Sequence, residues 1–104
     1  MEKTIQIAEL LDKTCELYDI AKEEIISRDT SQNALVPRIV FINVAKEYGW
    51  TYAEIGQAIN RTPSAIFHSI NSKLKKTALY ERGYNSLKNA TINESGRQYY
   101  YIES

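Results

Sequence analysis

Four polar side chains at helical spacing are the residues of this chain best suited to chemistry. Ser64, His68, Asn71 and Lys75 lie at i, i+4, i+7 and i+11, which would form one stripe along a helix over residues 63–76. A hydroxyl, an imidazole, an amide and an ammonium group can all hydrogen-bond to base edges or phosphates. The alternative is a solvated helix face without a ligand, and the segment before the stripe favours the DNA-reading interpretation.

That preceding segment indicates two helix starts with a tight turn between them. Thr51 and Glu54 match the S/T-x-x-E capping box, which satisfies free N–H groups at the start of a helix. Eleven residues after Thr51, Thr62 and Pro63 are typical of an N-cap and a first helical position. With residues 60–61 as the turn, this spacing is typical of a helix-turn-helix.

Apolar residues at helical spacing predict further helices on both sides of this motif, and therefore an all-α fold in one compact domain. A first helix is expected to begin near residue 4 or 5, a second to span residues 21–26, and a terminal one to span residues 78–89. Residues 27–33 are expected to form a loop. Pro37 then suits the first turn of a helix that ends near residue 48, because its missing N–H costs nothing there. The expected buried positions are Ile7, Leu10, Leu11, Cys15, Tyr18, Ile25, Ile26, Ile39, Val40, Val44, Ala45, Tyr48, Ile55, Ala58, Ile59, Ala65, Ile66, Ile70, Leu74, Tyr80, Tyr84 and Leu87.

The charge of the chain is unevenly distributed although its formal net charge is zero. Residues 1–30 hold four basic and eight acidic side chains, whereas residues 61–90 hold six basic and one acidic. Such polarity can present a cationic face to phosphates, and chance clustering on solvated faces is the alternative.

Other classes of protein find little support in the composition. No apolar run approaches the length of about 18 residues that a membrane span needs. A single cysteine, Cys15, favours core packing and a reducing, cytoplasmic setting. With one histidine and no catalytic or metal-ligating constellation, we expect no enzyme, no cofactor and no metal. A structural role for His68, packed against Thr51 or Tyr52, remains an alternative.

Three segments in order carry a family resemblance: KTCELYDIAKEEIISR, VPRIVFINVAKEYGWTYAEIG and NRTPSAIFHSINSK. They resemble, over roughly residues 5–76, the C-terminal DNA-binding domain of DnaA, the bacterial chromosomal replication initiator, whose helix-turn-helix is Trp-repressor-like. The family has a tyrosine-containing turn, an arginine opening a long helix, a hydroxyl-x-x-E-I-G box and a recognition helix with a histidine. Each piece alone is weak, and the combination is fairly specific.

The resemblance implies roles for three residues. Arg38 matches the family's phosphate-contacting and minor-groove arginine, Arg61 the arginine after the turn, and His68 the histidine of the recognition helix. Together with the polar positions identified above, the candidate DNA-binding residues are Arg38, Thr51, Arg61, Thr62, Ser64, Ala65, His68, Asn71, Lys73 and Lys75.

The chain departs from the family where the recognition helix begins. The family has Asp-His-Thr-Thr there, whereas residues 62–65 are Thr-Pro-Ser-Ala, and Asn60 replaces a glycine pair in a turn one residue shorter. The family's arginine-rich loop keeps only Arg28, so fewer phosphates would be neutralised and affinity should be lower. The resemblance thus predicts duplex DNA as the ligand and does not extend to the DnaA box as the sequence recognised.

These observations predict a DnaA domain IV-like helix-turn-helix domain over residues 1–76, followed by a C-terminal helix and tyrosine-rich tail over residues 77–104. The expected function is double-stranded DNA binding in replication initiation or its regulation, by a monomer, with replication proteins as further candidate partners. A transcriptional regulator is one alternative. Another is a protein-interaction adaptor or decoy that retains the fold, which the acidic first helix and the tyrosines of the tail would support.

Overall fold

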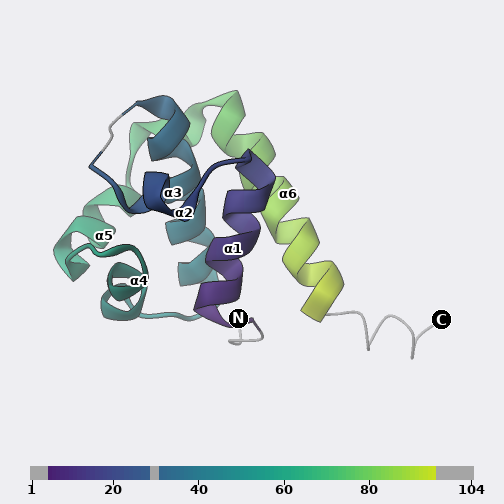
Figure 1. Ribbon diagram of the computed structural model, residues 1–104, viewed down its shortest axis with the longest axis horizontal. Helices are drawn as coiled ribbons and strands as arrows, with labels where there is room; N and C mark the ends of the chain where they lie inside the picture. The colour runs from purple at the N-terminus through teal and green to yellow at the C-terminus, as the bar shows by residue number, and fades with distance from the viewer. Residues whose placement is uncertain (1–4, 29–30, 96–104) are drawn as a thin grey trace.

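The computed structural model describes residues 5–28 and 31–95, the last four of them by their backbone only. All regular structure in these ranges is helical, which confirms the all-α fold class (Figure 1). In chain order the elements are α1 (Ile7–Tyr18), α2 (Lys22–Ile26), α3 (Gln32–Glu47), α4 (Tyr52–Ile59), α5 (Pro63–Ile70), the 3-10 helix η1 (Lys73–Lys76) and α6 (Ala78–Ser95). None of the described helices is both long and apolar enough to cross a membrane.

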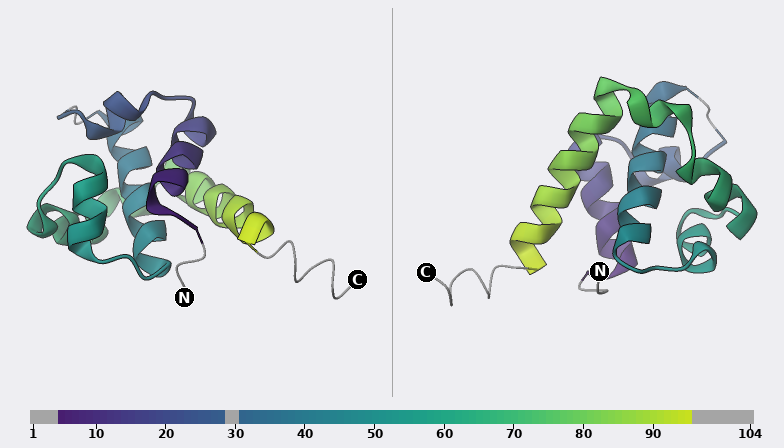
Figure 2. Two further views of the ribbon diagram at one scale, coloured as in Figure 1. Left: turned by 60° about the horizontal axis from the view of Figure 1, so that its bottom comes forward. Right: turned by 180° about the vertical axis from the view of Figure 1, so that it is seen from behind.

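The central element is α3, which contacts every other helix of the chain's described part. Its residues from 36 to 45 are buried around the whole circumference, so the middle of α3 has no solvated face. Figures 1 and 2 show α1 and α6 side by side against one flank of α3, and α4 and α5 on the opposite flank. The helix-turn-helix pair is therefore held on the molecule by a fully buried support.

The start of α3 differs from the sequence-based expectation. The helix begins at Gln32 after Ser31, so residues 32 and 33 are helical where a loop was expected. Pro37 lies five residues further in, beyond the first turn, where a proline removes a backbone hydrogen bond at a typical cost of about 3 kcal/mol. Ala34 and Val36 are nearly inaccessible to solvent, and their burial in the extra turn offsets that cost.

The terminal helix α6 is longer than expected and shares the core of the rest. It continues from Ala78 to Ser95, six residues beyond the predicted end. The Tyr48 hydroxyl donates a 2.6 Å hydrogen bond to Thr91 Oγ1, and both residues are buried. Lys88 Nζ lies 2.7 Å from Glu47 Oε1, where α3 ends. Although the expected boundary at residue 76 falls before α6, the packing joins the two segments. The tyrosines at 99–101 lie outside the described residues.

At Gly83 a side chain of α1 packs directly against the backbone of α6. The Tyr18 side chain crosses α6 at this glycine, and its hydroxyl donates a 3.1 Å hydrogen bond to the Leu79 carbonyl. A Cβ atom at position 83 would lie 2.9 Å from Tyr18 Cε2 and closer still to the phenol oxygen. The sequence predicts only that Gly83 weakens its helix, but the structure shows that its missing side chain makes room for the Tyr18 ring.

The core agrees with the expected apolar positions and includes others besides. All of the expected residues except Ala65 are buried or packed half-buried against the core, whereas Ala65 is half-buried at the edge of a surface hollow. Val36, Phe41 and Ile42 are also buried, because α3 is covered on all sides and not along one stripe. The observed helix starts of α1 and α2, at Ile7 and Lys22, lie within about two residues of those predicted.

Candidate nucleic-acid interface

The first helix of the motif, α4, begins with the predicted capping box. The Glu54 N–H donates a 3.1 Å hydrogen bond to Thr51 Oγ1, and the Thr51 N–H donates a 2.9 Å bond to Glu54 Oε1. Two of the N–H groups left open at a helix start are thereby satisfied. Thr51 itself is exposed, which places its hydroxyl at the surface beside the start of α4.

The turn between α4 and α5 depends on one close backbone approach. Asn60 ends α4 in the left-handed conformation, with φ of 59°, which asparagine tolerates better than most residues. The Arg61 N–H then donates a 2.8 Å hydrogen bond to the Gly56 carbonyl. A Cβ atom at Gly56 would overlap the Arg61 carbonyl oxygen and lie 3.4 Å from Ile66 Cγ1. Glycine at position 56 therefore allows the turn to be this tight.

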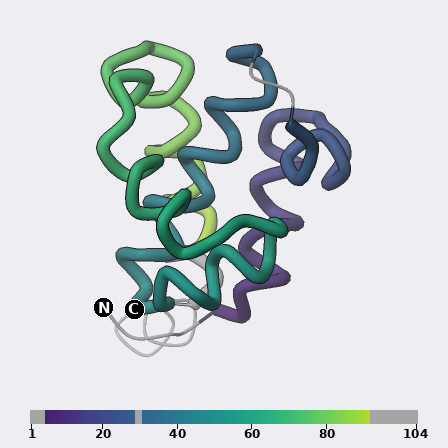
Figure 3. Tube along the Cα trace, turned by 90° about the vertical axis from the view of Figure 1, so that its left-hand side faces the viewer, coloured from purple at the N-terminus to yellow at the C-terminus, as the bar shows by residue number. Residues whose placement is uncertain are grey.

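The second helix, α5, begins as predicted and ends earlier. Thr62 is the N-cap, with its Oγ1 accepting a 3.2 Å hydrogen bond from the Ala65 N–H, and Pro63 occupies the first helical turn. Both features are confirmed. Figure 3 views the molecule from the side on which α4 and α5 lie nearest the reader.

The expected helix over residues 63–76 is wrong at its C-terminal end. α5 stops at Ile70, Asn71 is its C-cap, and Lys73–Lys76 form the separate η1. Ser72 has an extended backbone, and its hydroxyl accepts a 3.2 Å hydrogen bond from the Leu74 N–H, so a local side-chain cap replaces continued helix. Consequently the four polar residues of the stripe do not share one helix. Ser64 and His68 belong to α5, Asn71 to its cap, and Lys75 to η1.

The outer face of α5 contains one residue that the sequence analysis missed. Ser64, His68 and Asn71 are exposed, as expected, while Ala65 is half-buried. Phe67 lies at i+3 from Ser64 on the same face, with 50% of its surface exposed. Its ring contacts Tyr52 and His68 edge-to-face. The spacing 64, 67, 68, 71 was readable from the sequence, but an apolar residue gave no reason to look outside the core.

The two candidate arginines lie where α2 ends, away from the outer face of α5. Arg38 is only 6% exposed, and its Nε donates a 2.7 Å hydrogen bond to the Ile25 carbonyl. Arg61 Nη1 donates a 2.7 Å bond to the Ile26 carbonyl, and both arginines donate to the Ser27 carbonyl. Helix ends leave such carbonyls unsatisfied, and guanidinium groups there also match the helix dipole. In this structure, then, both arginines stabilise the fold.

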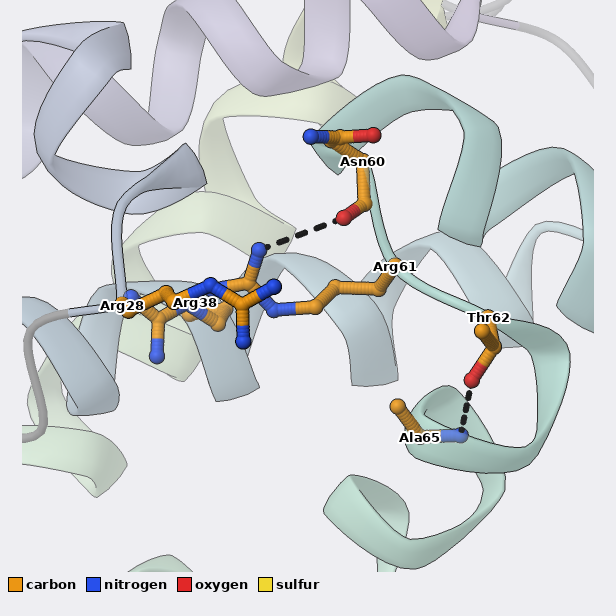
Figure 4. Close-up of a pocket in the computed structure, with 6 residues that line it drawn as sticks. All are labelled: Arg28, Arg38, Asn60, Arg61, Thr62 and Ala65. Carbon is orange, nitrogen blue, oxygen red and sulfur yellow. Dashed lines mark hydrogen bonds between the residues drawn. The ribbon is translucent and has the colours of Figure 1, made fainter.

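These side chains also border a surface hollow of about 400 Å³ beside the start of α5. Figure 4 shows Arg28, Arg38 and Arg61 gathered on one side of the hollow, with Thr62 and Ala65 on the other. Arg28 is exposed. Among the residues that the structure describes, those that line the hollow carry no carboxylate, and three of them are arginines, so its chemistry suits an anion such as a phosphate group.

Further cations lie just beyond α5. Lys73, Lys75 and Lys76 are all exposed on η1, and η1 packs against α3 and α6. Five acidic residues lie on the two amino-terminal helices: Glu9, Asp12 and Glu16 on α1, and Glu23 and Glu24 on α2. The three arginines of the hollow and the three lysines of η1 thus lie around the helix-turn-helix, while these acidic residues lie on other helices, an arrangement that can orient a polyanion.

A tight helix pair with an exposed second helix, and with cations on both sides of it, defines a DNA-binding helix-turn-helix protein. The chain belongs to the family described as bacterial dnaA protein helix-turn-helix, which it matches over residues 7–72, well over half of its length. The match ends at residue 72, just before η1, so η1 and α6 lie outside it although both pack against α3. A search of curated proteins finds no match for the chain.

Proposed function

We propose that this chain binds double-stranded DNA by placing α5 in the major groove, in replication initiation or its regulation. The observation that carries the proposal is the exposed face of α5, where Ser64, His68 and Asn71 offer hydrogen-bonding groups above a rigid, buried support. Membership of the DnaA helix-turn-helix family supports DNA as the ligand and replication as the setting. The major groove admits a helix of this kind and presents a distinct pattern for each base pair.

The roles proposed for the candidate residues follow from their places. Ser64 and Ala65 would approach base edges from the amino-terminal half of α5, and His68 from its last turn, with Asn71 at the C-cap. The exposed hydroxyls of Thr51 and Thr62 and the ammonium groups of Lys73 and Lys75 would contact the phosphate backbone. These contacts fix register, whereas the α5 side chains select sequence.

Arg38 and Arg61 would contribute from the hollow beside α5. Their guanidinium groups already bond to carbonyls, so they would add positive potential for a nearby phosphate even without touching it. One helix-turn-helix reads a short site, and we expect a monomer with modest affinity. Because DNA is the proposed ligand, we expect a cytoplasmic location, and we expect the chain to bind DNA without catalysing a reaction.

Selection of bound sequences from a random pool of duplexes tests this proposal most directly. An enriched consensus sequence is expected, and binding to it should weaken as salt rises because counterions are released. Lys75→Gln should reduce the slope of log K against log salt by about 0.9, because one phosphate fewer is neutralised. Arg82→Gln is the matched control, since Arg82 is an exposed cation on α6 beside Tyr18 of α1, and it should leave the slope unchanged.

Two results would overturn the proposal. One is the absence of binding to any duplex at low salt by the folded wild-type chain. That result, with capture of a protein partner, would favour the adaptor interpretation. The other would overturn its phosphate contacts at η1: the salt slopes of Lys75→Gln and of the double variant Lys73→Gln/Lys75→Gln would both equal that of wild type.

A further inference from the structure

Phe67 is an exposed aromatic residue in the middle of a polar surface, and the proposed hydrogen-bonding contacts leave it without a role. Large hydrophobic side chains exposed to this degree are few in the described part of the chain, the other being Leu17 at 40%. Phe67 lies on the outer face of α5 with the exposed residues Ser64 and His68, which is the face that the proposed function places against DNA. The inference that follows rests on the proposed DNA binding.

The surroundings of Phe67 fix its orientation. The Tyr52 ring lies 5.9 Å from the Phe67 ring at an interplanar angle of 76°, and the His68 ring lies 5.8 Å away at 71°. These edge-to-face contacts join the Phe67 ring to Tyr52 of α4 and to its neighbour His68 on α5, and they favour one orientation of the ring. A ring held in this way loses little conformational freedom when a ligand covers it.

The groups around the Phe67 ring are complementary to the groups of a DNA major groove, from the phosphates at its edge to the bases inside it. Lys46 Nζ lies 4.5 Å from the centroid of the Tyr52 ring, so a cation, an aromatic ring and the Phe67 ring follow one another across the surface. His68 and Ser64 continue the face beyond Phe67. Phosphates line the edge of the major groove, and the apolar group inside it is the C5-methyl of thymine.

We propose that Phe67 reads the C5-methyl group of a thymine in the major groove and thereby helps to determine sequence preference. Tyr52 positions the ring, and Lys46 adds a cation where the aromatic surface meets the DNA backbone. Contact between an aromatic side chain and this methyl group discriminates thymine from the other three bases without a hydrogen bond. Polar groups on α5 then need not supply all of the specificity.

The test replaces thymine by uracil, which keeps the base pairing and removes only the methyl group. Each thymine of the consensus duplex is substituted in turn, and affinities are measured for wild type and Phe67→Ala. Wild type should bind about fourfold more weakly at one position, equivalent to about 0.8 kcal/mol for one buried carbon. Phe67→Ala should bind the thymine and uracil forms of that position equally well, and Phe67→Leu should keep part of the preference.

Leu17→Ala is the matched control, because Leu17 is the comparably exposed apolar residue on α1. It should leave the thymine preference unchanged. A wild-type protein that binds its consensus equally well with uracil at every position would overturn this inference and leave the proposed function intact. Equal preference in wild type and Phe67→Ala, with both folded by circular dichroism, would also overturn it. Absence of duplex binding by wild type overturns both proposals.

Discussion

Replacing Gly83 by alanine should destabilise this protein, against the usual effect of that change in a helix. Alanine is about 1 kcal/mol more favourable than glycine inside a helix, so propensity alone predicts a more stable protein. Gly83 is buried beneath Tyr18, however, and the added Cβ would overlap the phenol ring. The ring must move away, because the α6 backbone is held by its contacts with α1 and α3.

The cost of that movement has two parts. Loss of the Tyr18 hydrogen bond to the Leu79 carbonyl costs about 1 kcal/mol, and partial exposure of the half-buried ring costs about 1 to 2 kcal/mol. After the gain in helix propensity, the free energy of unfolding should fall by about 1 to 2 kcal/mol. For a domain of this size, that corresponds to a midpoint temperature lower by roughly 4 to 10 °C.

A double-mutant cycle isolates the contact. Urea unfolding followed by circular dichroism is measured for wild type, Gly83→Ala, Tyr18→Ala and the double variant. In the Tyr18→Ala background the alanine at 83 should stabilise by about 1 kcal/mol, so its effect changes sign. Asn85→Ala, at an exposed position of α6, should have the same small effect in both backgrounds. A more stable Gly83→Ala protein in the wild-type background would refute the reasoning.

Three further perturbations follow from the structure. Gly56→Ala should lower the free energy of unfolding by about 1–3 kcal/mol, because its Cβ would overlap the Arg61 carbonyl; an unchanged thermal midpoint would contradict the tight-turn geometry. Thr51→Ala should cost about 1 kcal/mol by removing the capping box of α4, while Thr51→Ser should be nearly neutral in the same urea titration. Burial raises the pKa of Tyr18 to about 12, and burial together with Glu47 raises that of Tyr80 to about 12. The folded state therefore retains protons that the unfolded chain releases near pH 10, so stability should be full below about pH 10 and decline towards pH 12. Tyr80→Phe should make that decline shallower, and an equal pH profile would count against the assignment.

The parts of the fold that depend on neighbouring residues could be predicted from sequence. The capping box of α4 and the start of α5 at Pro63 are hydrogen-bonding patterns between residues three apart, and the structure confirms both. The start of α3 could not be predicted in this way. Pro37 predicts a first turn locally, whereas burial of Val36 against the remainder of the molecule lengthens the helix past it.

For the candidate site, too, local patterns could be predicted from sequence, whereas contacts between distant segments could not. Exposed polar residues on α5 were identified because their types suit DNA, and their contacts with DNA remain predictions. The carbonyl contacts of Arg38 and Arg61 depend on α2 lying beside the turn, which no local pattern indicates. Phe67 was missed because an apolar residue near a helix is assigned to the core by default, and only the packing shows that it points outward.

The carbonyl groups at the end of α2 would compete with DNA phosphates for the guanidinium group of Arg61. A phosphate that takes the Nη1 and Nη2 groups of Arg61 would displace the Ile26 and Ser27 carbonyls, so that contact would be an exchange of acceptors. The measured affinity would then contain the difference between two sets of bonds, smaller than either set alone. The same exchange would separate α2 from the turn, so one event would strengthen the complex and loosen the protein.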